Sequence, residues 1–194
     1  MSAVFSIKLL LKEQLTIPEI VSFIKKENTN CEIDLIETHD DWEFSNEKRL
    51  SVGQIEDCDS LIRQGKMVRI YGVLESLFQF SMFLYKPAQT IYATSFGIST
   101  KGIEMLDNDY ITQDNKEVYS FITNKITTTI NKDILLVGAI GSELTLFYES
   151  SFEDILKESY GACEWIFPDE KPYSYLDKYS KSQVNGFTIY CLKA

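Results

Sequence analysis

The stretch that decides the fold runs from Lys66 to Ser99 and reads KMVRIYGVLESLFQFSMFLYKPAQTIYATSFGIS. Its aromatic side chains crowd into three runs, which are separated by Glu75-Ser76 and by residues 86–89. In the middle run, residues 78, 80, 82 and 84 are all large and apolar, and this period of two is typical of a strand with one fully buried face. The stretch therefore predicts a three-stranded antiparallel meander at the centre of a sheet.

The residues before the meander predict a β-α-β unit that opens the chain. Residues 3–11 are apolar enough for a first strand, and the alternation of residues 31–35 predicts a second one. Between them Thr16 and Glu19 have the spacing of a capping box, which predicts a helix over residues 16–27. A short helix over residues 55–62, closed by Gly65, leads into the meander.

The residues after the meander predict two more helices and three strands. Asp114 and Glu117 predict the start of one helix, and Ser151 predicts the start of the other. The predicted strands cover residues 133–140, 143–148 and 186–192. Together these patterns predict one α+β domain over residues 1–194, with a mainly antiparallel sheet and about four helices packed on it.

Composition sets limits on where the protein works. The chain has 194 residues, of which 44% are hydrophobic and 13% aromatic. Its longest strongly apolar stretch, residues 76–85, is far shorter than the ~20 residues of a membrane-spanning helix. Four cysteines without a C-x-x-C pair predict free thiols rather than a zinc site or a redox dithiol. We expect a cytoplasmic protein that neither enters a membrane nor carries a cofactor.

Charge is the most informative bulk property. The net charge of −10 argues against nucleic-acid binding, which needs Lys and Arg for the phosphates. Residues 37–59 carry eight acids against two basic residues, and residues 149–170 carry seven acids against Lys157 alone. Such segments serve either as general solubilising charge or as a negative surface that steers a basic partner. The candidate binding residues in these segments are Glu37, Asp40, Asp41, Trp42, Glu43, Asp57, Asp59, Glu164, Trp165, Asp169 and Glu170.

The segment Glu37–Glu43 concentrates the residue types that carry chemistry. It contains His39, which is the only histidine, together with four carboxylates and Trp42. Three interpretations remain open for it: a solvated acidic loop, a binding loop anchored by Trp42, and a divalent metal site of a hydrolase.

Other catalytic patterns are incomplete. If residues 31–39 form one strand, Cys31 and His39 lie ~26 Å apart, too far for a nucleophile and its base. The segment Gly138–Ser142 lacks the remaining residues of a phosphate-binding loop, so we interpret it as a bulge or a tight hairpin. No catalytic residue is predicted.

In size, acidity and lack of catalytic motifs, the chain resembles the small cytoplasmic immunity proteins that bacteria keep against toxins. The resemblance is one of composition and assigns no residue roles. It implies a non-enzymatic module that covers a basic protein partner, which on this view is a toxin domain. The alternatives are a metal-dependent hydrolase or nucleotide-handling enzyme built on residues 39–43, and a subunit of a larger assembly.

Overall fold

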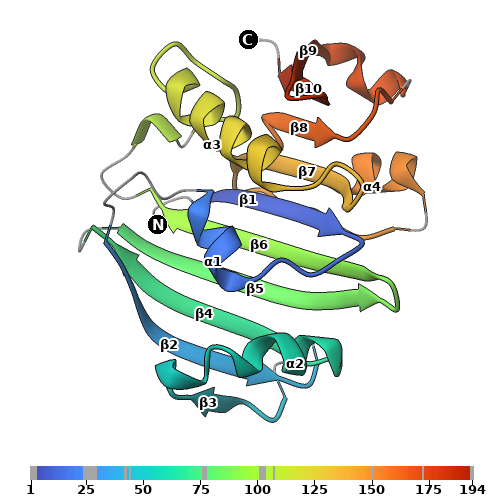
Figure 1. Cartoon of the computed structure of the whole chain (residues 1–194). Coiled ribbons are helices and arrows are strands. Elements are labelled where there is room, and N and C mark those ends of the chain that lie inside the picture. Colours follow the sequence, from blue (N-terminus) through green and yellow to red (C-terminus); the bar gives the residue numbers. More distant parts are fainter. Residues whose placement is uncertain are drawn as a thin grey trace.

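In the computed structural model of the chain, the described residues form ten antiparallel strands of a single sheet (Figure 1). The structure describes residues 4–23, 30–41, 43, 45–75, 78–100, 104–106, 108–149, 151–171 and 173–192. The strand order across the sheet is β3-β2-β4-β5-β6-β1-β7-β8-β10-β9. The strands are β1 (Val4–Leu11), β2 (Cys31–His39), β3 (Lys48–Leu50), β4 (Met67–Leu74), β5 (Phe78–Ala88), β6 (Ile91–Ser99), β7 (Leu135–Ser142), β8 (Glu164–Phe167), β9 (Tyr179–Val184) and β10 (Phe187–Leu192).

In the part of the chain that the structure describes, four α-helices and three short 3-10 helices connect these strands. The α-helices are α1 (Ile17–Ser22), α2 (Asp57–Arg63), α3 (Lys116–Thr129) and α4 (Phe152–Glu158). The 3-10 helices are η1 (Val52–Gln54), η2 (Glu104–Leu106) and η3 (Ser174–Lys178). The expected α+β architecture with an antiparallel sheet and four helices is therefore confirmed. Within the described residues, no helix has the length and apolar character that crossing a bilayer requires.

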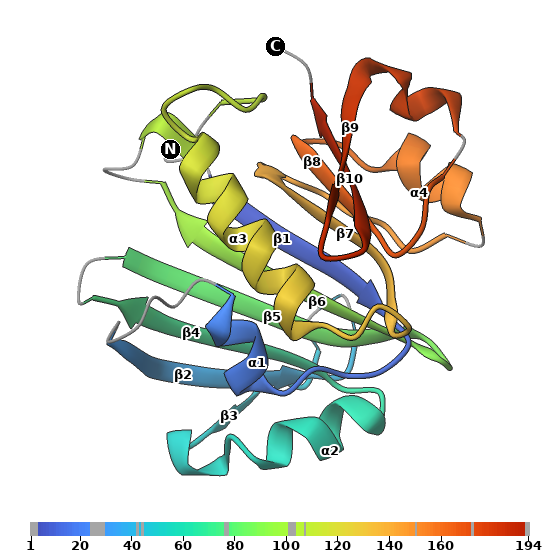
Figure 2. The ribbon, with the colours of Figure 1, turned by 45° about the horizontal axis from the view of Figure 1, so that its top comes forward.

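The two faces of the sheet bury separate cores. Helices α1, α2 and α3 cover one face, where Ile20, Ile62 and Ile126 join the odd-numbered side chains of β1 (Figure 2). On the opposite face Leu10 of β1 packs in a second core, which includes Trp165 and the apolar side of α4. Successive strand residues point to opposite faces, so β1 contributes to both cores at once.

The first strand holds the sheet together. β1 pairs with β6 on one side and with β7 on the other, so it lies near the middle of the strand order. The strands β4, β5 and β6 follow one another in the sheet as in the sequence. β1 and β2 are not neighbours, because β6, β5 and β4 lie between them. Thr16 caps α1 and forms the capping box with Glu19, and residues 24–27 of the predicted helix lie outside the described residues.

Three local predictions are wrong. Residues 143–148 do not form a strand: Glu143 has a positive φ of 49°, and only an isolated bridge between Thr145 and Tyr160 forms there. The segment Gly138–Ser142 lies inside β7 rather than in a turn. The N-cap of α3 is Asn115 instead of Asp114.

A close approach of two chain segments explains a glycine in β7. A Cβ atom at Gly141 would lie 1.8 Å from the carbonyl oxygen of Gly161, which precedes β8. Gly161 itself has a φ of +78°. The glycines therefore serve packing and chain reversal at the junction of β7 and β8, and they form no phosphate-binding loop.

Candidate functional site

The first acidic segment lies at the β3 edge of the sheet. β2 ends at His39, and the chain returns through the exposed residues Asp40, Asp41 and Glu43 to the edge strand β3. Trp42, the predicted anchor of this loop, lies outside the described residues.

Two of the loop carboxylates are engaged within the chain. The Ser45 hydroxyl donates a hydrogen bond to Asp41, as do the backbone N–H groups of Ser45 (3.2 Å) and Glu43 (3.0 Å), and these donors lower the pKa of the Asp41 carboxyl. Asp40 forms an ion pair with Lys66, whose contact holds the pKa of that carboxyl below its usual value. These contacts fix the course of the loop, and both side chains remain exposed to solvent.

Four carboxylates near β3, Asp41 among them, have no cationic partner in the described part of the chain. Among the described residues, Asp41, Glu43, Glu56 and Asp57 form no ion pair, and all four are exposed. Asp59 is half-buried and accepts a hydrogen bond from Gln14 Nε2 at 2.7 Å. We call Asp41, Glu43, Glu56 and Asp57 the acidic edge, because they flank the edge strand β3 in the sequence.

The second acidic segment has a different character. Trp165 has no exposed surface and Glu164 is 4% exposed, so in this structure neither side chain is accessible to a partner. Both lie in β8, where every residue is buried between neighbouring strands and helices. The exposed carboxylates Glu153, Asp169 and Glu170 form ion pairs with Lys157 (2.8 Å), Lys132 (3.0 Å) and Lys181 (2.7 Å). Lysines, two of them distant in the sequence, thus pair with three of the six exposed acids of this segment.

The two acidic segments do not meet. Five strands separate β2 from β8, which places them roughly 29 Å apart at the usual strand spacing. Their helices also lie on opposite faces, because Cys58 and Ile62 of α2 join one core and Ile155 of α4 joins the other. They are therefore two separate surfaces.

His39 has different acidic neighbours from those that its sequence position suggested. Its ring is 1% exposed, and ligand atoms of His39, Glu37 and Glu47 all lie within 4.8 Å of one another. His39 Nε2 lies 4.0 Å from Glu37 Oε2. Arg49 Nε lies 3.7 Å from Glu37 and 3.5 Å from Glu47, so a guanidinium already partly balances both carboxylates.

A third polar cluster surrounds Glu164 in the core. The Thr123 hydroxyl and the Cys191 thiol both donate to its carboxylate, the latter at 3.2 Å. Burial raises the pKa of Glu164 to about 7 despite these donors. Desolvation thus outweighs hydrogen bonding at this carboxyl group.

The cysteines are free thiols that do not favour a nucleophile. Burial raises the pKa of Cys58 to about 11 and also raises those of Cys163 and Cys191. A thiol is reactive mainly as its thiolate, which these environments disfavour at neutral pH. Cys31 and His39 lie at opposite ends of β2, as their spacing in one strand requires.

Sequence reasoning missed a groove on the sheet face opposite α1–α3. It contains Lys8, which the sequence shows only as a charged interruption of an apolar strand. The available signal was the position of that lysine, in the middle of an otherwise largely buried central strand. The neighbours that complete the groove come from residues 81–97, residues 143–148 and Tyr160, and no local pattern links these segments.

Neither a family model, nor a curated protein, nor a solved structure matches this chain. Its function must therefore be argued from its own residues.

Proposed function

We propose that this chain is a non-enzymatic, cytoplasmic protein-binding module that contacts a basic partner through the acidic edge. The partner class that fits its small size and its charge is a basic protein, such as a toxin domain held inactive by an immunity-like inhibitor. This contact surface is smaller than the set of binding residues that the sequence suggested. Trp42 and Asp59 stay candidate binding residues beside the acidic edge.

The observation that carries the proposal is the group of unpaired carboxylates that flanks the exposed edge strand β3. The acidic edge keeps four exposed carboxylates without an ion pair among the described residues, and in the second segment lysines pair with three of the six exposed acids. Uncompensated like charges raise the association rate of an oppositely charged partner and disfavour other partners. Among the described strands β3 has a neighbour on one side alone, so its outer side adds unpaired backbone groups to this surface.

The test compares two double variants with the same change in net charge. Glu43→Lys with Glu56→Lys reverses charge at the acidic edge, and Glu149→Lys with Glu158→Lys reverses charge near α4. All four residues are exposed and form no ion pair among the described residues. The wild-type chain is used at low salt to capture proteins from its source cells, and basic domains encoded by neighbouring genes are tested directly.

For a partner found in this way, we expect the association rate constant of the edge variant at low salt to be lower than that of the wild type by about tenfold or more. The α4 variant is expected to bind like the wild type, and raising the salt concentration should reduce the difference. Equal binding by the two variants would rule out the acidic edge as the contact surface. Light scattering of the free chain shows whether it associates with a second copy of itself, which is the homo-oligomeric form of the larger-assembly alternative.

A second candidate function is a metal-dependent reaction at Glu37, His39 and Glu47. The observation that favours it is the convergence of one imidazole and two carboxylates, a ligand set that zinc and related ions accept. Ligands of a tetrahedral zinc ion lie ~3.4 Å apart, so these atoms must close in by roughly 1 Å and displace Arg49. The first proposal requires no such rearrangement, and we therefore rank it higher.

Calorimetric titration with Zn²⁺, Mn²⁺ and Mg²⁺ tests this second candidate. If the site is real, Glu47→Ala weakens binding at least about tenfold, while Glu43→Ala in the same loop leaves it unchanged. Binding that both variants retain, or no binding by the wild type, removes the metal-dependent function.

A further inference from the structure

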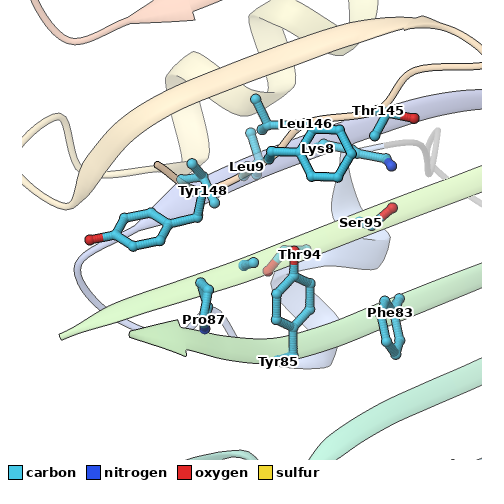
Figure 3. Close-up of a pocket in the computed structure, with 13 residues that line it drawn as sticks. Lys8, Leu9, Phe83, Tyr85, Pro87, Thr94, Ser95, Thr145, Leu146 and Tyr148 are labelled. Atoms are coloured by element: carbon cyan, nitrogen blue, oxygen red, sulfur yellow. The ribbon is translucent and has the colours of Figure 1, made fainter. Parts of the chain in front are cut away.

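The sheet face opposite α1–α3 contains a groove formed by β1, β5, β6 and residues 145–148. Its main part has a volume of about 470 Å³, and Figure 3 shows Lys8 and Ser95 on the same side of it. A second hollow of about 330 Å³ shares Lys8, Phe83, Ser95 and Thr145 with the first, so the two form one continuous depression. We call it the β1–β5–β6 groove; its volume is in the range of small-molecule sites.

Lys8 places a cationic amine in this groove without a counter-charge. It lies in a central strand and is half-buried, and burial lowers its pKa. Within the described part of the chain, its ammonium has no hydrogen bond or ion pair. A desolvated ammonium is costly unless an anion or a hydrogen-bond acceptor joins it.

Three serine hydroxyls stand beside Lys8 on the floor of the groove. The register pairs Lys8 with Ser95, and pairs Gly97 with both Ser6 and Ser81. A Cβ atom placed on Gly97 would lie 3.6 Å from Ser81 Oγ and 3.7 Å from Ser6 Oγ. Both hydroxyls therefore border the space that the glycine leaves open. None of the three hydroxyls makes a hydrogen bond with a described residue. Together with Lys8 they form a set of donors that lacks an acceptor.

Aromatic side chains surround these donors. Phe83 and Tyr85 lie on β5 with ring centroids 5.3 Å apart, and both line the main part of the groove. Of the seven exposed large apolar side chains in the described part of the chain, four line the two hollows: Val4, Phe147, Tyr148 and Tyr160. Phe147 is 47% and Tyr160 61% exposed. Apolar exposure concentrated around one depression is typical of a binding site.

The charge of the lining limits the ligand to a single negative charge. Lys8 is the one cation among the described lining residues, and Glu143 at the far end accepts a hydrogen bond from the backbone N–H of Val4 at 2.8 Å. A polyphosphate would meet too few cations and a carboxylate. We infer that the β1–β5–β6 groove binds a small organic acid, whose carboxylate meets Lys8 and the serine hydroxyls and whose aromatic body lies against Phe83, Tyr85 and the 147–148 rim. This site goes beyond the protein-binding function proposed above and uses none of the residues of the acidic edge.

The probe that tests the inference is 2-naphthoate, compared with its uncharged analogue 2-naphthamide. Both are titrated into the full chain by calorimetry at neutral pH. For a ligand of this size we expect a Kd of about 1 mM or lower for naphthoate. Because a charge-assisted hydrogen bond is stronger than a neutral one, naphthoate should bind about tenfold or more tightly than the amide.

Variants divide the interaction into its two parts. Lys8→Met replaces the ammonium by an apolar group of similar length, and should remove the preference for the acid while keeping affinity for the amide. Lys132→Met removes an exposed lysine elsewhere and should behave like the wild type. Phe147→Ala with Tyr148→Ala should weaken both ligands alike, because it removes only apolar contact. Ser81→Ala with Ser95→Ala should weaken naphthoate severalfold, which keeps the inference testable if Lys8→Met fails to fold.

Several outcomes would overturn the inference. These are no binding of either ligand by the wild type, equal affinity for acid and amide, and an unchanged preference for the acid in the Lys8 variant. Loss of that preference in the Lys132 variant would also overturn it, since the effect would then be one of overall charge. A tetrapeptide that ends in Phe with a free carboxylate is the last comparison. If it binds about tenfold more tightly than naphthoate, the occupant is a chain terminus and the small-molecule ligand is rejected.

Discussion

Glu164 shows at the scale of one residue how burial changes the chemistry of a side chain. The sequence presents it as part of an acidic surface, but it lies in β8 with 4% of its surface exposed. Its pKa of about 7 in the folded chain lies above its ordinary value of 4.5. Between these two values the folded chain holds a proton that the unfolded chain releases, so a rise in pH favours unfolding.

We predict that this one group lowers the free energy of unfolding by about 3 kcal/mol as the pH rises from 4.5 to above 7. Glu164→Gln should remove that part of the pH dependence, because the amide does not titrate and keeps the shape of the side chain. Urea unfolding at several pH values between 5 and 8 measures the difference between the chains. Glu170→Gln, on an exposed carboxylate, is the control and should retain the wild-type slope. If Glu164→Gln left the slope unchanged, the pH dependence would have to be assigned to another group.

Gly141 gives a second prediction at this scale. Gly141→Ala places a Cβ atom against the Gly161 carbonyl. The nearest atoms are all backbone atoms of Gly161 and Cys163, so the clash can be relieved only by moving the backbone. We expect a loss of about 3 kcal/mol in the free energy of unfolding, at the upper end of ordinary overpacking. Gly53→Ala is the matched control, because its Cβ meets nothing within 4 Å. Equal stability of the two alanine variants in urea titrations would show that the two segments are not tightly packed.

At the scale of the element, the start of α3 shows why a capping pattern can be assigned one residue too early. The spacing of Asp114 and Glu117 fits a capping box, but Asp114 is exposed and Asn115 is fully buried at the N-cap. The Asn115 side chain accepts from the Thr112 N–H at 2.7 Å and donates to the carbonyls of Met105 (3.0 Å) and Tyr110 (3.3 Å). It therefore ties the preceding loop to the helix instead of capping the helix itself.

We predict that Asn115→Ala costs about 2 kcal/mol of stability, because it removes three part-buried hydrogen bonds between the side chain and the preceding loop. Asp114→Ala should change stability by less than about 0.5 kcal/mol, as is usual at an exposed position. Thermal and urea unfolding of both variants measure the difference. A larger loss at position 114 than at 115 would restore the capping box that the sequence suggests.

At the scale of the whole molecule, β1 determines how the two halves of the sheet depend on each other. It pairs with residues 92–99 on one side and with residues 135–142 on the other. Within the sheet, β1 therefore connects the group of strands β2 to β6 with the group β7 to β10. The same strand supplies side chains to both cores. Unfolding one half removes partners from the other.

We predict that the chain unfolds in one cooperative transition. Hydrogen exchange followed by mass spectrometry should then give the same limiting opening free energy for the slowest amides of β4 and of β8. Leu9→Pro, which removes a donor from the middle of β1, should prevent stable folding of both halves together. Distinct opening free energies for β4 and β8 would divide the chain into two units and contradict the expectation of one domain.

The sequence by itself determined the elements whose signals are local. The period of two in residues 78–85 and the capping box of Thr16 and Glu19 both depend on neighbouring residues. The dipeptide Asn185-Gly186 is likewise a local signal of a tight hairpin, and both residues have positive φ (49° and 83°) in the structure. The mainly antiparallel α+β class follows from these signals. The net negative charge follows from the composition alone.

Only the tertiary structure decided which side chains share a surface. It buried Glu164 and Trp165, paired Asp169 and Glu170 with distant lysines, and brought His39 close to Glu47. It also set Lys8 beside Ser95 and Phe83, which are more than 70 positions away in the sequence. The reason is physical: the strand order follows from the packing of two cores on β1, and this long-range packing leaves no periodicity in any one segment from which to infer it.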